Sequence, residues 1–216
     1  MSAEWHPVPY AAGMESSLRD RKKVRTRAAI VAAATELFTT RGYEQTTVAD
    51  IAAAADIGTR TFFSYFPSKE ELLFPSSDAR VDAAVAAIAA RSPGDEPADV
   101  LLRALRDAAA ADDDLVSPLA KLRLELIRTV PAVRGRGLQL QVDAQREIAR
   151  HLAAAFPERL DEVAAAALVG AFVGAVTGAL LVLMEDPEAV AGGPEALKER
   201  LQRATDVALR PWSASA

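Results

Sequence analysis

The sequence predicts an all-α protein, and three observations support this fold class. Alanine-rich segments such as "VAAATELF", "IAAAAD" and "VDAAVAAIAA" favour helix. Segments with the alternating, β-branched pattern of a strand are few. Glycine and proline stand mostly between the alanine-rich segments, where they would end helices. Half of the 216 residues are hydrophobic, which is enough for one sizeable core or for a small domain joined to a larger one.

Composition narrows the environment and the partners of the chain. It has no cysteine, which excludes disulfides and thiolate metal sites and suits a reducing cytoplasm. Residues 1–18 lack the basic start and the apolar segment of a signal peptide, and we expect them to form a disordered tail. The net charge is −5, yet residues 19–27, "RDRKKVRTR", carry six basic residues against one acid. The acidic excess lies after Leu73, so the net charge does not exclude a nucleic-acid partner.

The first two helices are expected within the N-terminal quarter of the chain. One covers residues 21–40 and ends before Gly42, a residue typical of helix C-termini. Thr46 or Thr47 can cap the next helix, which ends before Gly58. The apolar residues that recur at helical spacing in the first helix are Val24, Ala28, Ile30, Val31, Ala34, Leu37 and Phe38.

A third helix can run only from about Thr59 to Phe66, because Pro67 lacks a backbone donor and disfavours helical geometry in the residue before it. Two short helices joined by a tight turn, after a longer helix with a basic start, are the organisation of a helix-turn-helix DNA reader. Phe62 and Phe66 lie four residues apart and can anchor the third helix to the first two. The residues left to face outward are Thr59, Arg60, Thr61, Phe63 and Tyr65.

Outward aromatic side chains beside an arginine need a partner, and the phosphates and base edges of a major groove supply one. The alternative is that Phe63 and Tyr65 cover a neighbouring helix. Arg60 suits a bidentate contact with guanine and, equally, a contact with a phosphate.

The segment "TTVADIAAAADIGTRTFFSYFPSKEELL" resembles the helix-turn-helix signature of TetR-like transcriptional regulators. Extended back through "RAAIVAAATELFTTRGYEQ", the likeness covers residues 24–73. It implies a recognition helix in the major groove and a helical C-terminal domain that holds the dimer and an effector pocket. By position, Thr47 would contact one phosphate, Lys69 would clamp another, and the outward residues of the third helix would line the DNA face. The alternative for Lys69 is a partner within a solvated helix surface.

Two positions depart from the family pattern. Gly58 stands where the family usually has serine or threonine, so the recognition helix loses a side-chain cap at a cost of about a few tenths of a kcal/mol. Phe63 replaces a common tyrosine and lacks its hydroxyl, although the ring can pack on sugar or on a thymine methyl. In front of these helices we expect a mobile basic arm that attracts DNA without sequence preference. Its residues are Arg21, Lys22, Lys23, Arg25 and Arg27.

The remainder of the chain predicts a second, larger helical domain. A fourth helix, kinked near Pro75, is expected to run to about Ala90. It would connect a helix-turn-helix domain of residues 19–73 to an effector-binding and dimerisation domain of residues 74–210, with a tail over 211–216. About nine helices result in total. The further helices are expected near residues 97–111, 117–130, 132–156, 160–184 and 194–209.

Residues 163–184 carry no charge and are long enough to cross a bilayer. Their acidic flanks, without basic or aromatic anchors, argue against a membrane. A helix that is apolar all round must then be buried all round, which one chain cannot easily achieve. We expect a two-fold homodimer with a four-helix interface; the alternative is a core helix of a monomer. The expected interface residues are Gly170, Gly174, Gly178, Leu181, Leu197 and Leu201.

The candidate effector pocket combines apolar residues with two polar ones. Arg123 falls inside an apolar arc, and Gln145 interrupts the apolar stripe of the next long helix. Such a cavity would suit an amphipathic anion; alternatively, Arg123 snorkels or pairs with an acid such as Glu147. The segment from "LELIRTV" to "HLAAAF" also resembles the C-terminal domain of mycofactocin-type TetR-like regulators, which implies a fatty acyl-CoA as ligand. The expected pocket residues are Leu119, Leu122, Arg123, Leu126, Val142, Gln145 and Phe172.

Together these features predict a cytoplasmic, dimeric TetR-like regulator without metal or cofactor. We expect a repressor that leaves its operator when a small apolar or amphipathic molecule occupies the C-terminal domain, although the residues by themselves do not distinguish repression from activation. The alternatives are a helical protein-interaction module and an enzyme. An enzyme would have only His6 and His151 as histidines, and no nucleophile, phosphate-binding glycine loop or metal-ligand cluster can be recognised.

Overall fold

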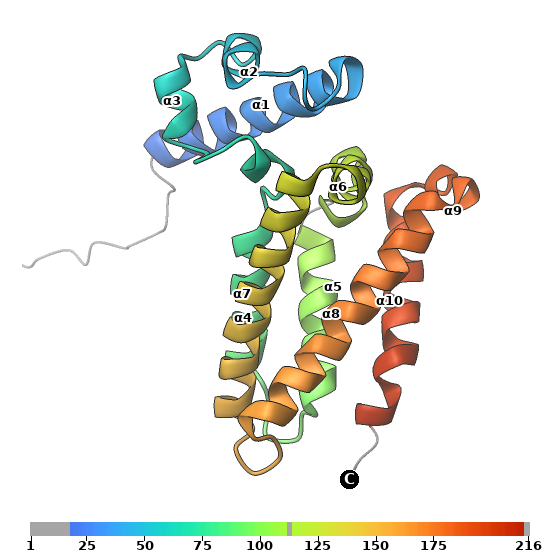
Figure 1. Ribbon diagram of the computed structural model, residues 1–216. Helices are drawn as coiled ribbons and strands as arrows, with labels where there is room; N and C mark the ends of the chain where they lie inside the picture. Colours follow the sequence, from blue (N-terminus) through green and yellow to red (C-terminus); the bar gives the residue numbers. More distant parts are fainter. Residues whose placement is uncertain (1–17, 112–113, 214–216) are drawn as a thin grey trace, which may run out of the picture.

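The computed structural model describes residues 18–111 and 114–213, which form ten α-helices, two short 3₁₀ helices and no strand. The all-α prediction is confirmed, with one α-helix more than expected. A small head of three helices sits on a larger body of long helices (Figure 1). The predicted tails lie largely outside the described residues.

The head consists of α1 (Leu18–Arg41), α2 (Val48–Ala54) and α3 (Thr59–Phe63). In Figure 1, α1 spans the width of the head. Apolar side chains from all three helices and from the segment after α3 form its core, which gives the short α2 and α3 the tertiary support that helices of this length need. The main buried residues are Ile30, Ala34, Phe38, Tyr43, Ile51, Ala52, Phe62 and Phe66.

The buried face of α1 begins later than the apolar pattern predicted. Val24 is 68% exposed and Ala28 is also exposed, so the first buried residue of the stripe is Ile30. Just before it, Arg27 covers the head with its guanidinium 4.2 Å from the centroid of the Phe66 ring. Arg27 thus covers part of the head core just before the buried stripe begins, because a long arginine side chain can pack on aromatic surface.

The predicted fourth helix is divided at Pro75. The 3₁₀ helix η1 (Glu70–Leu73) precedes the division and α4 (Ser77–Ala89) follows it. Phe74 has φ −127° and ψ 46°, outside helical geometry, as expected for a residue before proline. The linker between head and body is therefore a break between two segments instead of a kink in one helix.

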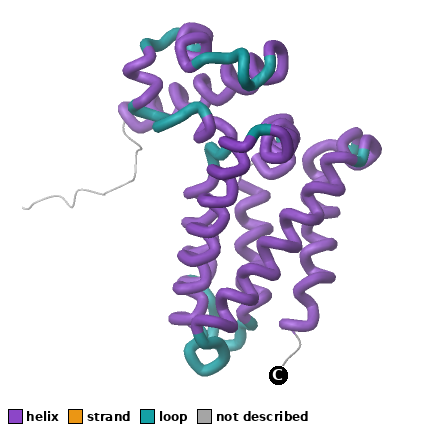
Figure 2. Tube along the Cα trace, in the orientation of Figure 1, coloured by secondary structure: helices purple, strands orange, loops and turns teal. Residues whose placement is uncertain are grey.

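The rest of the body contains six α-helices and one further 3₁₀ helix. They are α5 (Pro97–Ala111), η2 (Asp114–Val116), α6 (Pro118–Thr129), α7 (Pro131–Ala155), α8 (Glu162–Glu185), α9 (Pro187–Ala191) and α10 (Gly193–Ser213). Four of them start with proline, at the position where a missing backbone donor does no harm. Figures 1 and 2 show the long helices running down the body and α6 lying directly below the head.

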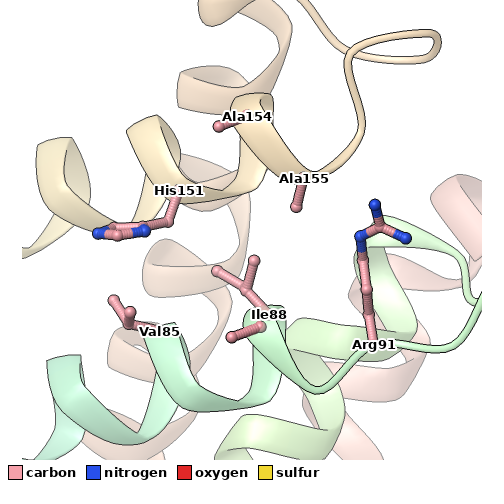
Figure 3. Close-up of a pocket in the computed structure, with 7 residues that line it drawn as sticks. Val85, Ile88, Arg91, His151, Ala154 and Ala155 are labelled. Carbon is pink, nitrogen blue, oxygen red and sulfur yellow. The ribbon is translucent and has the colours of Figure 1, made fainter.

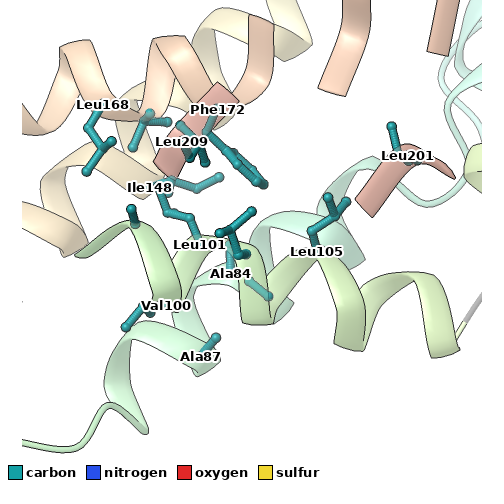
Figure 4. Packing of buried hydrophobic residues seen from close by; sticks show 14 of the residues in the cluster. Ala84, Ala87, Val100, Leu101, Leu105, Ile148, Leu168, Phe172, Leu201 and Leu209 are labelled. Carbon is teal, nitrogen blue, oxygen red and sulfur yellow. The ribbon is translucent and has the colours of Figure 1, made fainter. Parts of the chain in front are cut away.

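The core of the body is built by α4, α5, α7, α8 and α10 (Figure 4). Leu101 and Leu105 come from α5, Ile148 from α7, Phe172 from α8 and Leu201 from α10. All five side chains are buried, as is Ile88 of α4, and each helix therefore contributes an apolar face to one shared interior.

The core of the head continues into the body. Leu119 and Leu126 of α6 and Val133 of α7 are buried in the same cluster as the head residues. A Cβ atom at Gly137 of α7 would lie 3.2 Å from the Phe74 ring, so the glycine allows this close approach. The predicted domain boundary falls inside this packed region.

Candidate nucleic-acid interface

Local hydrogen bonds fix the start of the helix-turn-helix. The Thr47 hydroxyl accepts from the backbone N–H of Asp50 at 3.1 Å, and the Asp50 carboxylate accepts from the backbone N–H of Thr47 at 2.8 Å. These bonds form a capping box, and the hydrogen bonds from Thr47 lower the pKa of Asp50. Thr46 is buried and donates to the Gly42 carbonyl oxygen at 2.8 Å. Of the two candidate caps, the structure uses Thr47.

Four residues, 55–58, form the turn between α2 and α3. Asp56 has φ 54°, a left-handed geometry that aspartate tolerates better than most residues. The backbone N–H of Ile57 donates to the Ala52 carbonyl oxygen at 2.9 Å. Gly58 is the N-cap of α3 and makes no side-chain bond, as its departure from the family pattern implied. The α-helix ends at Phe63, earlier than predicted, and a turn completes the segment.

The α3 segment has one buried face and one open face. Phe62 and Phe66 are buried in the head, as predicted. The Phe63 ring is 55% exposed and meets Phe62 edge-on at a centroid distance of 5.3 Å. Tyr65 is half-buried against the head core, in line with the alternative that it covers a neighbouring element. The other exposed side chains predicted for the DNA face are Thr59, Arg60 and Thr61.

Lys69 contacts the segment before α2. Its ammonium donates to the carbonyl oxygens of Tyr43 at 2.8 Å and Thr46 at 3.1 Å, and it lies 4.0 Å from the Tyr43 ring centroid. Burial lowers the pKa of Lys69. The pKa of Tyr43 is raised by burial and by the hydrogen bond that the Tyr43 hydroxyl donates to Glu70. Lys69 therefore has a structural role, and since an ammonium has three donors it retains capacity for a phosphate.

The basic residues predicted as a mobile arm belong to the helix α1. Arg27 is held in place by the carbonyl oxygens of Tyr65 at 3.2 Å and Pro75 at 3.0 Å. The expectation of mobility is therefore corrected, because the helix continues through this segment and Arg27 is tied to the linker. The exposed basic residues in the early turns of α1 are Arg21, Lys22, Lys23 and Arg25.

The structure does not bring the seven predicted effector-pocket residues into one cavity. Leu119 and Leu126 lie in the core of the head, whereas Phe172 lies in the core of the body. Val142 is 45% exposed on α7. The helical periodicity correctly placed the apolar residues of α6 on one face, but that face packs against the core of the head. Leu122 and Gln145 are half-buried, and Arg123 is buried.

Arg123 pairs with an acid, as one of the two predicted alternatives proposed, but with Asp114 instead of Glu147. Its Nη1 lies 3.2 Å from Oδ2 of Asp114, and both residues are 7% exposed. Glu147 instead contacts Arg150 and His151. The sequence offered no signal for Asp114 beyond its place in an acidic run, because the partner is chosen by the turn that η2 makes before α6.

An open hollow of about 420 Å³ lies between α4 and α7 (Figure 3). Val85 and Ile88 of α4 lie opposite His151 of α7, and Arg91 stands beyond the end of α4. The Arg91 guanidinium lies 4.8 Å from the centroid of the Phe156 ring. An apolar floor with the cation of Arg91 at its rim suits an amphipathic anion. None of the predicted pocket residues lines this hollow.

The helix α8 leaves one apolar face open. A Cβ atom added at Gly170, Gly174 or Gly178 would meet no other heavy atom within 4 Å. Leu181 is 37% exposed and Val182 is 68% exposed. By length and composition α8 could cross a membrane, and 28% of its most apolar window is buried inside the chain. A single chain therefore does not cover this helix, as the sequence predicted.

The residues predicted for the dimer interface on α10 face inward. Leu197 and Leu201 are buried in the core of the body, since α10 turns this stripe toward α5 and α8. Their assignment to an intermolecular contact is wrong for that reason. On the outer side of α10, Ala204, Val207 and Ala208 are exposed.

A capped helix-turn-helix with an exposed arginine and aromatic ring, mounted on a helical body, is the arrangement typical of DNA-binding regulators. Within the described part of the chain, no group of histidine and acidic side chains is placed to hold a metal ion. Residues 30–74 match the family model for bacterial regulatory proteins of the tetR family. The chain belongs to the TetR family of transcriptional regulators, whose members are not enzymes.

Relatives extend the likeness beyond the head. The regulator TcmR of Streptomyces glaucescens is 34% identical over 150 residues, which cover 67% of this chain and 66% of TcmR. HbdR of Aromatoleum sp. (strain CIB) is 38% identical over 65 residues, or 30% of this chain and 28% of HbdR. The chain thus spans just under two thirds of the first relative. The crystal structure of the repressor FadR of Thermus thermophilus with lauroyl-CoA superposes with a TM-score of 0.56 at 23% identity, covering 88% of this chain and 96% of FadR. At this identity the superposition shows a shared fold.

Proposed function

We propose that this chain binds operator DNA through α3 and regulates transcription. The observation that carries the proposal is the exposed row on α3, whose backbone is fixed to the head by buried Phe62. In helix-turn-helix proteins the second helix enters the major groove, where arginine can bond guanine and an aromatic ring can pack on a thymine methyl. The residues of the row are Thr59, Arg60, Thr61 and Phe63.

Contacts to phosphates would place this row in register. Thr47 is exposed at the N-terminus of α2, where the helix dipole also favours an anion. Lys69 has a donor left beyond its two carbonyl contacts. The exposed basic residues of α1 add attraction without sequence preference. Tyr65 can reach a phosphate only with its hydroxyl end, since the ring packs in part on the head.

We propose a homodimer that covers the open face of α8. The three glycines of this face would allow two α8 helices to approach closely, and Leu181 and Val182 would be buried beside them. Exposed Val207 on the outer side of α10 extends the apolar surface. A dimer explains the exposed apolar face without a membrane, and a regulator of chromosomal DNA would act in the cytoplasm.

The proposed mode of action is repression released by an amphipathic acid. The hollow beside Arg91 and His151 supports this class of ligand, because apolar side chains from α4 and α7 line it as well. A ligand between these helices would displace α4, the helix that follows the linker to the head. Long-chain acyl-CoAs and free fatty acids are the first compounds to test, since the structural neighbour FadR was solved with lauroyl-CoA.

Selection of bound sequences from random duplexes tests operator binding. We expect a palindromic sequence with two half-sites to be enriched and its affinity to fall steeply with salt. A duplex from the region upstream of the chain's own coding sequence should then be retarded in a gel. Absence of any enriched sequence, with the head shown to be folded, would favour a helical protein-interaction module instead.

Release of a preformed operator complex tests the effector class. Acyl-CoAs and fatty acids of increasing length should dissociate the complex, and Arg91→Gln should raise the required concentration by about tenfold. Arg103→Gln on α5 is the matched control, because Arg103 pairs with Asp95 and does not line the hollow. Equal release of Arg91→Gln and wild type would place the ligand elsewhere.

A further inference from the structure

A cluster of charged side chains joins the head to the body. Arg123 of α6 donates from Nη1 to the carbonyl oxygen of Leu73, the last residue of η1, at 2.9 Å. The same nitrogen lies 3.2 Å and 3.3 Å from the two carboxylate oxygens of Asp114. Asp114 also accepts from Arg80 of α4 at 2.6 Å. We refer to Arg80, Asp114 and Arg123 as the junction cluster; it ties α4, η2 and α6 to the linker.

Because the junction cluster is buried, its hydrogen-bond distances can vary only within narrow limits. Asp114 and Arg123 are withdrawn from water, so each charge is stabilised only while its partner stays within hydrogen-bonding reach. Hydrogen bonds depend on distance and angle, whereas apolar burial is non-directional. The junction cluster therefore restricts the position of η1 on α6 more narrowly than the apolar residues around it.

Two further contacts hold the same linker. Glu71 of η1 forms an ion pair with Arg136 near the start of α7. From the other side, Arg27 of α1 donates to the Pro75 carbonyl oxygen at 3.0 Å. Arginines from the head and from two helices of the body thus hold the linker, residues 71–75. The linker is a fixed joint and not a free hinge.

We propose that Asp114 and Arg123 are positioning residues for operator binding: they hold the head at the angle that matches one half-site spacing. This inference rests on the proposed function as a dimeric DNA-binding regulator. In a two-fold dimer, the distance between the recognition helices must equal the distance between half-sites. Loss of the Arg123 contacts frees the head over a range of angles, so the arrangement competent for one spacing becomes a smaller fraction of the population.

Arg123→Leu is the principal test, because it removes the bond to Leu73 while Asp114 keeps Arg80 as partner. Arg123→Lys is the second variant: it keeps a charge for Asp114, but an ammonium cannot reproduce the planar fork of a guanidinium. Arg103→Leu is the control, since it breaks an arginine–aspartate pair of 2.6 Å away from the linker. Each protein is titrated with the selected operator, with operators lengthened or shortened by one or two base pairs between half-sites, and with a single half-site.

Wild type and Arg103→Leu are expected to lose affinity by about tenfold or more when one base pair is inserted. Arg123→Leu should bind the selected operator about tenfold more weakly, discriminate spacing by less than about threefold, and bind the single half-site like wild type. Arg123→Lys should show the same relaxed spacing with near wild-type thermal stability. Wild-type spacing discrimination in both junction variants overturns the inference; if Arg123→Leu fails to fold, Arg123→Lys decides.

A measurement without DNA separates this inference from the proposed function. The chain has no cysteine, so Ala54→Cys in α2 and Arg106→Cys in α5 place one spin label on the head and one on the body. In dimers diluted with unlabelled chain, pulsed electron spin resonance should give a narrow distance distribution that broadens in both junction variants. Equal distributions overturn the positioning role even if no duplex is bound. If the distributions broaden in the junction variants but the wild-type chain binds no duplex, the role of the junction cluster in holding the head is supported and the proposed DNA-binding function is rejected.

Discussion

At the scale of the residue, the Thr47 hydroxyl acts both as an acceptor and as a donor of hydrogen bonds in the first turn of α2. It accepts from the Asp50 backbone N–H and donates to the Asp50 carboxylate, which also receives the Thr47 backbone N–H. A helix of seven residues has few hydrogen bonds of its own, so these contacts matter for its stability. The residue that the family pattern assigns to a phosphate is thus also a structural cap.

Thr47→Ala should reduce the free energy of unfolding by about 1 kcal/mol, because the N-cap bond is lost. It should also raise the pKa of Asp50, whose lowered value depends first on the hydrogen bond from the Thr47 side chain. Urea unfolding and carboxyl titration by NMR measure the two effects. Thr39→Ala is the control, since the Thr39 hydroxyl bonds a carbonyl within α1 and its loss should change stability little. If both variants lose the same free energy of unfolding, Thr47 does not stabilise the head as an N-cap.

Arg60 and Lys69 are expected to differ in what they contribute to DNA binding. Arg60 is exposed on α3, so Arg60→Ala should cost about 1 to 3 kcal/mol of binding and relax preference at one base position. Lys69→Ala should weaken all duplexes alike and reduce the salt slope by about one. It should also destabilise the head, because the carbonyl oxygens of Tyr43 and Thr46 lose their donor. A panel of single-base operator variants at several salt concentrations checks this. If the two variants lose affinity in the same way across the panel, Arg60 contacts the DNA phosphates instead of a base.

At the scale of the element, α8 combines opposite requirements on its faces. Leu168 and Phe172 are buried in the core of the chain, while Gly170, Gly174 and Gly178 have no neighbour at the Cβ position. A larger side chain on the glycine face therefore does not disturb the fold of one chain. It can act only on what covers that face.

Gly174→Leu should break the dimer while leaving the chain folded. In an isolated helix the change is favourable by about 0.5 to 1 kcal/mol, but in a tight two-fold contact overpacking costs about 1 to 3 kcal/mol in each subunit. Light scattering at micromolar concentration should find monomers. Gly135→Leu on α7, also open at its Cβ position, should stay dimeric. A dimer mass for Gly174→Leu would place the interface on another surface.

At the scale of the whole molecule, carboxylates stabilised by hydrogen bonds are expected to weaken the fold in acid. Bonds from Arg103 lower the pKa of Asp95, those from Arg150 and His151 lower that of Glu147, and a backbone bond from Ala189 lowers that of Asp186. Each folded pKa lies below the unfolded value, so the unfolded chain binds more protons in acid. The contribution to stability is therefore present above about pH 4.5 and is lost as pH falls through the folded values.

The urea midpoint should accordingly be level near neutral pH and fall steadily below about pH 4.5. Asp95→Asn should lower the midpoint at neutral pH and flatten the acid branch, because the Arg103 contact no longer depends on ionisation. Unfolding curves at a series of pH values give both quantities. A midpoint that stays constant or rises in acid would show that these carboxylates are not the groups that control stability.

The DNA-reading head could be predicted from sequence in most respects because its signals are local. The cap at Thr47 and the inward positions of Phe62 and Phe66 depend on residues within one or two turns. Pro67 set only an upper limit for α3, which ends earlier, at Phe63. Hydrogen bonds and sterics over such short spans leave little choice to the rest of the molecule.

Contacts between distant elements were decided by the tertiary structure. Periodicity identified the stripe with Leu197 and Leu201 but not its neighbour, because apolar contacts are non-directional and fit an internal core as well as a partner. Arg123 required an acid, yet only the path of η2 selects Asp114. By itself, then, the sequence determined most of the helices, the helix-turn-helix motif and an apolar α8 in need of cover. Which faces meet, and the buried joint between head and body, followed from packing, since directional bonds form only where packing brings their partners together.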